Sequence, residues 1–251
     1  MLLAGAVASL ATAQVTFQDL VDGQMDPTRW LTYSGDFTGR RHSPLVQIAP
    51  ANVGRLTAQW TFQTDVSPYM STGRSGGLQS VPLAIDGVLY FAGPHNVVWA
   101  IDGRTGRQIW QYRRAMPPDV PSTTTRGVTR GLSVLGDRLF FATLDAHMIA
   151  LDIRTGKLVW DTVMEDYHKF FSATSAPLVI GENRVVAGIG GADRGAHRFF
   201  LDAYDTRTGY RLWRFYTVPA SGEPGSESGQ LPRQWSAAAA LLGPPAATIP
   251  S

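Results

Sequence analysis

The chain has 251 residues, of which 44% are hydrophobic and 17% are charged. This composition supports a packed core and excludes a globally disordered chain. The net charge is only +2, and arginine pairs such as Arg40–Arg41 are isolated, so a basic groove for nucleic acid is excluded. The absence of cysteine excludes disulfides, cysteine-ligated zinc and c-type haem attachment within this sequence, although it does not exclude export.

Residues 1–13 are predicted to form a signal peptide. Leu2–Ala13 is an uncharged apolar run that ends in the small residues Ala11-Thr12-Ala13, a pattern typical of signal-peptidase sites. The segment predicts cleavage before Gln14 and a periplasmic location. Its positive n-region is missing, so we expect the true start to lie upstream, and a short buried helix is the alternative. Twelve residues are too few to span a membrane, and no later segment is apolar enough to do so.

One phrase, Ala-x-Asp-x-x-Thr-Gly-x-x-x-Trp, occurs three times in the middle of the chain. The copies begin at Ala100, Ala150 and Ala203, and an earlier segment, 52–60, ends in the same way. The four tryptophans are Trp60, Trp110, Trp160 and Trp213, separated by 50, 50 and 53 residues. A period of this length is typical of a repeat architecture.

The chemistry of the phrase predicts a β-hairpin. Its Asp carboxylate can accept backbone N–H groups of the following turn, and the Gly after Thr can adopt a positive φ. Before each copy comes another predicted turn, at 86–87, 136–137 and 181–183, and a strand start near 81–83, 132–134 and 176–178. Each unit therefore holds about four short strands and no helical pattern.

A four-stranded unit cannot bury both of its faces alone, so the units are expected to stack around an axis as the blades of a β-propeller. The fold prediction is thus all-β, with about four blades over residues 14–227. A chance recurrence in a β-sandwich is the alternative. The paired glycines of a kelch-type propeller do not recur with the period, since Gly76-Gly77 and Gly190-Gly191 are not one repeat apart.

The phrase resembles the tryptophan-docking motif of the PQQ-dependent (quinoprotein) alcohol dehydrogenases, where PQQ is pyrroloquinoline quinone. Further stretches similar to that family are 30–36, 143–147 and 214–227. The resemblance implies a single eight-bladed propeller that holds PQQ and Ca²⁺ near its axis and in which each Trp packs between neighbouring blades. It also implies that this chain is the N-terminal half of such a propeller.

The same resemblance implies a set of cofactor-binding residues: Gln79, Arg130, Thr174, Gly190, Gly191 and Ala192. Arg130 matches an Arg that contacts the PQQ carboxylates, and a guanidinium suits them because it binds carboxylates bidentately. Thr174 matches a hydroxyl donor to PQQ, and Gln79 stands where many members have a Glu. The glycines match a loop that lies along the quinone plane. Each residue also has a structural alternative, such as a surface ion pair for Arg130 or an ordinary strand position for Thr174.

Asp193 is the predicted metal ligand, at the position of a Glu that binds Ca²⁺ in the methanol-oxidising branch. A carboxylate is a hard oxygen ligand, but Asp is shorter than Glu, and a turn Asp beside glycines is the alternative. The sequence departs from the family at 119–125, where it lacks the vicinal cysteine pair of several branches. The five histidines show no metal-ligand spacing.

Residues 228–251 form an atypical Ala/Pro-rich stretch, which we interpret as a frameshifted or a natural tail. The family's catalytic Asp base lies downstream of this point, so we assign no catalytic residue and expect the isolated product to be inactive. The resemblance implies a periplasmic oxidoreductase that oxidises a small alcohol and passes electrons to a cytochrome c or a quinone. The alternatives are a non-enzymatic propeller scaffold, similar to outer-membrane assembly proteins, and an inactive truncated product.

Overall fold

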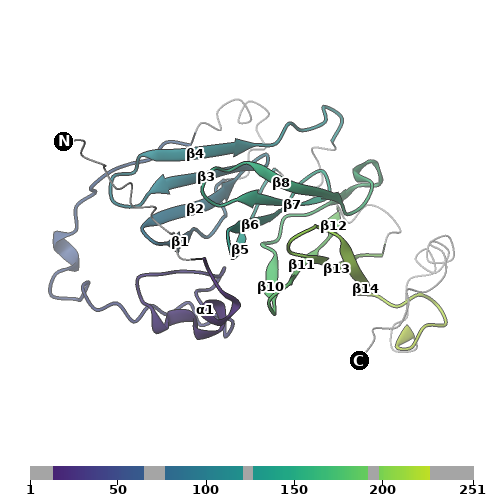
Figure 1. Ribbon diagram of the computed structural model, residues 1–251, viewed down its shortest axis with the longest axis horizontal. Helices are drawn as coiled ribbons and strands as arrows, with labels where there is room; N and C mark the ends of the chain where they lie inside the picture. Colours follow the sequence, from purple (N-terminus) through teal and green to yellow (C-terminus); the bar gives the residue numbers. More distant parts are fainter. Residues whose placement is uncertain (1–13, 65–76, 121–126, 192–197, 227–251) are drawn as a thin grey trace, which may run out of the picture.

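Three four-stranded antiparallel sheets form the body of the protein in the computed structural model, which describes residues 14–64, 77–120, 127–191 and 198–226 (Figure 1). The first sheet contains β1 (Leu83–Ile85), β2 (Val88–Gly93), β3 (Val97–Asp102) and β4 (Gln108–Arg113). The second contains β5 (Ser133–Leu135), β6 (Arg138–Ala142), β7 (His147–Asp152) and β8 (Leu158–Val163). The third contains β10 (Leu178–Ile180), β11 (Arg184–Gly188), β13 (Phe200–Asp205) and β14 (Arg211–Tyr216). A small fourth sheet pairs β9 (Phe171–Ser172) with β12 (Gly190–Gly191).

The repeated phrase forms the hairpin between the third and fourth strand of each sheet, as predicted. In the first copy, Asp102 Oδ1 accepts hydrogen bonds from the backbone N–H groups of Arg104 and Thr105 and from the Thr105 hydroxyl. These bonds hold the pKa of Asp102 below its ordinary value, and the bond from the backbone N–H of Thr105 has the largest effect. Gly106 follows with a φ of 70°, in the left-handed region that favours glycine. The other two copies repeat these three bonds around Asp152 and Asp205.

Each repeat tryptophan that precedes a described sheet donates a hydrogen bond to the hairpin of that sheet. Trp110 Nε1 donates to the carbonyl of Ile153 at 3.0 Å, and Trp160 Nε1 donates to that of Thr206 at 3.1 Å. Trp60 makes the equivalent bond to Gly103 in the first sheet, at 3.1 Å. The propeller prediction is therefore confirmed as three complete blades, with the Trp60 segment in the place of a preceding one.

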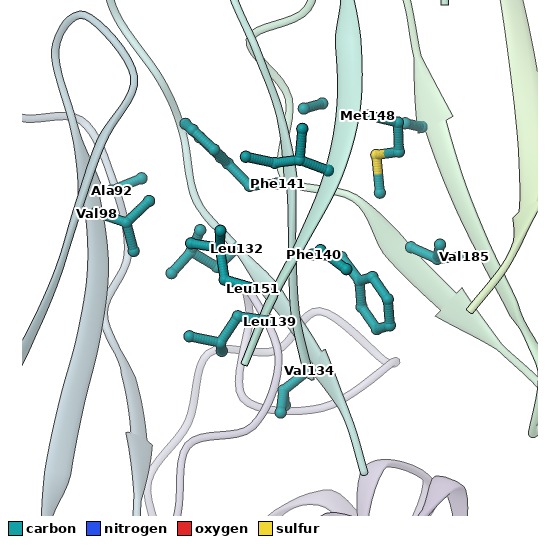
Figure 2. Close-up of a cluster of buried hydrophobic side chains, with 14 of the residues drawn as sticks. Ala92, Val98, Leu132, Val134, Leu139, Phe140, Phe141, Met148, Leu151 and Val185 are labelled. Atoms are coloured by element: carbon teal, nitrogen blue, oxygen red, sulfur yellow. The ribbon is translucent and has the colours of Figure 1, made fainter. Parts of the chain in front are cut away.

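The apolar core lies between the sheets, and the middle sheet is buried on both faces. Phe140, Leu139 and Leu151 are fully buried in β6 and β7. Figure 2 shows Ala92 and Val98 of the first sheet on one side of these residues and Val185 of the third sheet on the other. This two-sided burial explains why β6 and β7 are almost continuously apolar rather than alternating.

Partly buried arginines also join neighbouring sheets. Arg214 in β14 donates to Asp202 of β13 at 2.8 and 2.9 Å, and to Glu165, which follows β8, at 2.9 Å. Arg114, which follows β4, likewise contacts Asp145 and Asp161 of the second sheet, each at 2.8 Å. Arg214 therefore links the third blade to the second, and Arg114 links the first blade to the second.

The N-terminal segment forms one backbone bridge to each of the first two sheets. Val15 pairs with Gly136, and Trp30 pairs with Ala84 of β1. Between them is α1 (Phe17–Asp22), followed by the 3-10 turn η1 (Gly23–Met25); the other 3-10 turns are η2 (Val53–Arg55) and η3 (Tyr167–Lys169). The sequence reasoning missed α1, although Thr16 and Asp19 form a capping box at its start. No helix of the described ranges is long and apolar enough to cross a membrane.

The predicted signal peptide, residues 1–13, and the atypical stretch, residues 228–251, lie outside the residues that the structure describes.

Candidate functional site

The segments that carry the predicted cofactor residues are joined by backbone hydrogen bonds. The N–H of Val81, two residues after Gln79, donates to the carbonyl of Arg130 at 3.3 Å. The N–H of Arg130 donates to the carbonyl of Thr174 at 2.9 Å. These residues precede β1, β5 and β10, the first strands of three consecutive sheets. The propeller geometry thus gathers residues that are almost a hundred positions apart in the sequence.

Arg130 and Thr174 are also in contact through their side chains. Arg130 Nη1 donates to Thr174 Oγ1 at 2.5 Å, and the Arg130 side chain is exposed. Within the described ranges, no carboxylate forms an ion pair with Arg130. Because a guanidinium carries five N–H donors, Arg130 can still offer a bidentate pair to an anion while Thr174 holds it in place.

Gly190 and Gly191 lie beside the Thr174 segment. As β12, they pair with Ser172 and Phe171 of β9, just before Thr174. A Cβ at Gly191 would overlap the carbonyl oxygen of Phe170, so close backbone approach requires glycine there. A Cβ at Gly190 would meet no atom of the described residues within 4 Å, so none of them fills the space beside its backbone.

Two buried hydroxyls near these residues have no hydrogen-bond partner among the residues that the structure describes. They are Thr129 Oγ1, next to Arg130, and Ser172 Oγ, opposite Gly190, and the two residues are 1% and 2% exposed. Buried polar groups without a partner are uncommon and need an explanation. The sequence analysis singled out neither hydroxyl, since nothing in a lone Thr or Ser indicates that its hydroxyl is buried.

The other predicted residues are less informative. Gln79 is exposed and lies in the segment before β1. Ala192 and the predicted metal ligand Asp193 lie outside the described residues. In the parts of the chain that are described, no three His, Asp or Glu side chains are grouped closely enough to hold a metal ion. A Ca²⁺ site therefore stays a prediction that rests on Asp193.

A histidine and two carboxylates join the same two interblade connections that contain Arg130 and Thr174. His168 in η3 contacts Asp166 at 2.8 Å through Nδ1 and Asp119 at 3.1 Å through Nε2. The Tyr167 hydroxyl also donates to Asp119. The hydrogen bond to Asp166, and secondarily that to Asp119, raises the pKa of His168 above its ordinary value. The side chain of His168 is 59% exposed, so this cluster is a surface contact between two loops.

We expect the His168 contacts to stabilise the fold in a defined pH window. Because the pKa of folded His168 is raised, their contribution is full below pH 6.5 and is lost as the pH rises through that raised value. The pKa of Asp166 is lowered, chiefly by its bond to His168, so on the acid side the contribution is lost as the pH falls below 3.8 through the lowered value. An NMR titration of the His168 ring should give a midpoint above 6.5 that falls in Asp166→Asn; a midpoint that does not change in this variant would contradict the assignment.

Comparison with known proteins agrees with this architecture. The family described as "Glucose/ethanol/alcohol dehydrogenase, beta-propeller domain", of PQQ enzymes, matches residues 30–240. The chain belongs to the PQQ-dependent alcohol dehydrogenase β-propeller family. The quinohemoprotein alcohol dehydrogenase ADH IIB of Pseudomonas putida is 38% identical over 200 residues, which cover 78% of this chain and 27% of that protein. The 1-butanol dehydrogenase (cytochrome c) of Thauera butanivorans is 36% identical over 202 residues, with the same shares.

Solved structures of two dehydrogenases share the fold. The quinohemoprotein alcohol dehydrogenase ADHIIG of Pseudomonas putida HK5 is 33% identical and has a TM-score of 0.71, covering 82% of this chain and 29% of that one. A europium-containing methanol dehydrogenase is 29% identical, with a TM-score of 0.70, and covers 82% and 35%. The chain thus spans between a quarter and a third of the length of the curated relatives named above.

The described residues fit one side of a PQQ-type cradle. PQQ is planar and carries carboxylates, and the site offers a guanidinium without a carboxylate partner among the described residues, next to a glycine with open space beside it. The hydroxyls of Thr129 and Ser172 supply further hydrogen-bonding capacity that no described protein group uses. This donor set suits a planar polyanion far better than a cation.

Proposed function

We propose that this chain supplies one side of the PQQ cradle of a periplasmic quinoprotein that oxidises small alcohols. The observation that carries the proposal is the Arg130–Thr174 pair, an exposed guanidinium held by a hydroxyl beside the open backbone of Gly190. Ca²⁺ belongs to the same proposal, with Asp193 as its ligand.

Each residue has a distinct role in this proposal. Arg130 binds a PQQ carboxylate, and Thr174 orients the guanidinium through its hydroxyl oxygen. Gly190 leaves room for the flat ring system to lie against the backbone. PQQ, when bound, supplies the two-electron redox chemistry, while these residues supply orientation and charge.

The names of the relatives support the proposed substrate and electron acceptor. Two proteins of Thauera butanivorans are a 1-butanol dehydrogenase (cytochrome c) and a 1-butanol dehydrogenase (quinone), 36% and 34% identical to this chain. We therefore propose a small alcohol as the substrate and a cytochrome c or a quinone as the acceptor. The periplasmic location rests on the predicted signal peptide.

Replacing Arg130 tests the proposal. Loss of a charge-assisted, bidentate hydrogen bond removes about 1.5–3 kcal/mol, so Arg130→Ala should weaken PQQ binding about 10- to 150-fold. Arg130→Lys should recover part of the affinity, since it restores charge but not the two parallel bonds. The measurement is the quenching of tryptophan fluorescence during titration with PQQ in the presence of Ca²⁺.

The matched control is Arg154→Ala, which removes an exposed arginine from a hairpin turn. It should leave the PQQ affinity unchanged. Equal losses in the two variants would refute a specific role of Arg130. An unmodified chain that shows no saturable PQQ binding would instead favour a non-enzymatic scaffold.

A further inference from the structure

The turn between β2 and β3 joins the first sheet to the segment that carries Arg130. Its residues His95 and Asn96 have φ values of 58° and 59°, in the left-handed region that is unfavourable for residues other than glycine. Two such residues in succession persist only where the surrounding contacts enforce the conformation. The contacts of these two residues therefore show what the turn holds in place.

Asn96 anchors the turn to the first and second sheets. Its side chain is fully buried, and Oδ1 accepts a hydrogen bond from the backbone N–H of Leu144, between β6 and β7, at 3.0 Å. The backbone carbonyl of Asn96 accepts from the N–H of Arg114, which follows β4, at 3.2 Å. The turn is thus a fixed point at the interface between the first two blades.

His95 connects this fixed point to the Arg130 segment. Its backbone N–H donates to the carbonyl of Gly127 at 3.0 Å, and its half-buried ring lies against the same residue. A Cβ at Gly127 would lie 2.9 Å from Nε2 and 3.1 Å from Cε1 of His95, and the φ of Gly127 is 72°, so both the approach and the conformation require glycine. Gly127 stands three residues before Arg130, and Val128 and Thr129 between them are buried.

The His95 ring contributes shape rather than charge to this contact. Burial, and secondarily the nearby Arg113 guanidinium, lowers the pKa of His95 below its ordinary value. The ring is therefore uncharged at neutral pH. It packs against the backbone of Gly127 without adding a second positive charge next to the segment that carries Arg130.

We propose that His95 is a positioning residue for Arg130, which holds residues 127–130 in place before PQQ binds. The inference rests on the proposed PQQ site and deepens it. A binding group that is fixed in advance strengthens binding, because the complex does not have to order it. The backbone bonds of Arg130 to Thr174 and Val81 remain without His95, so the expected effect is smaller than that of replacing Arg130 itself.

Two replacements of His95 separate the ring from the turn. Asn adopts the left-handed conformation readily, so His95→Asn keeps the turn and removes the ring. It should weaken PQQ binding about 2- to 12-fold, measured by quenching of tryptophan fluorescence in the presence of Ca²⁺. His95→Phe restores a flat ring and should recover most of the affinity. The opposite order, with full affinity in His95→Asn and a loss in His95→Phe, would assign His95 to the turn alone and overturn the proposal.

The glycine side of the contact gives an independent test. Gly127→Ala pushes the His95 ring away and should weaken PQQ binding by a similar factor. Gly136→Ala introduces alanine at a similar φ of 61°, where its Cβ meets no described atom within 4 Å, and should leave the PQQ affinity unchanged. The double variant His95→Asn/Gly127→Ala should bind no more weakly than Gly127→Ala, because both changes remove one contact. Losses that multiply in the double variant would overturn the proposal.

A measurement without PQQ separates this inference from the proposed function. In the unliganded chain, the backbone order parameters of Thr129 and Arg130 should be about 0.85 and should fall towards about 0.6 in His95→Asn, while that of Thr174 stays unchanged. Values for Thr129 and Arg130 that do not change would overturn the positioning role, even if PQQ binds as proposed. The expected fall in an unmodified framework that shows no PQQ binding would support the positioning role and refute the proposed function alone.

Discussion

Gly156→Ala should lower the free energy of unfolding by about 2 to 5 kcal/mol. Gly156 has a φ of 68°, and a Cβ there would lie 2.5 Å from the Trp110 ring. A left-handed conformation is unfavourable for a non-glycine residue by about 1–2 kcal/mol, and overpacking adds about 1–3 kcal/mol. The substitution also pushes the Trp110 indole away from the Ile153 carbonyl. Urea denaturation followed by fluorescence measures the loss.

Gly136→Ala is the matched control for this prediction. Gly136 has a similar φ of 61°, but a Cβ there would meet no atom of the described part of the chain within 4 Å. Only the conformational penalty remains, so we expect a loss of about 1–2 kcal/mol. If the two variants lose the same stability, the tryptophan–glycine contact does not stabilise the interface between blades.

Arg214→Ala should lower the free energy of unfolding by about 3 kcal/mol or more. Asp202 is fully buried and bound by Arg214 through two nitrogens, so the variant leaves a buried carboxylate without its main partner. Breaking a buried ion pair by removing one partner typically costs about 3–5 kcal/mol. Arg211 lies 3.7 Å from Asp202 but is half exposed, so it offsets only part of the loss.

Two comparisons test this explanation. Arg154→Ala removes an exposed arginine that is 3.9 Å from Asp152, and should change stability by less than about 1 kcal/mol. The double variant Arg214→Ala/Asp202→Asn should be more stable than Arg214→Ala, because the buried carboxylate at position 202 is no longer left without its partner. A double variant no more stable than Arg214→Ala would assign the effect to lost packing against Phe200, over whose ring the guanidinium lies at 3.4 Å.

The repeat made most of the fold predictable from sequence. The Asp, Thr and Gly of each phrase have local roles in a turn, so their spacing alone predicts the hairpin, and the structure confirms it. The terminal Trp has a role between blades, which the regular period indicates. In contrast, α1 has only six residues and a capping box with Asp in place of Glu, a weak pattern that the analysis of repeats did not detect.

The candidate site was predictable only in part, because its contacts are set by the arrangement of blades. The resemblance indicated Arg130 and Thr174, and the structure places them in hydrogen-bond contact. The unpaired hydroxyls of Thr129 and Ser172 depend on burial between segments that are distant in sequence, and no local pattern encodes that.

The most direct test of the account is to map PQQ binding on the isotopically labelled chain by NMR. Titration with PQQ and Ca²⁺ should shift the backbone signals of Arg130, Thr174, Gly190 and Gly191 together, with one saturation curve. Saturation that leaves these four residues unchanged would contradict the claim that the loops before β5 and β10, together with the β12 glycines, form one side of a quinone cradle.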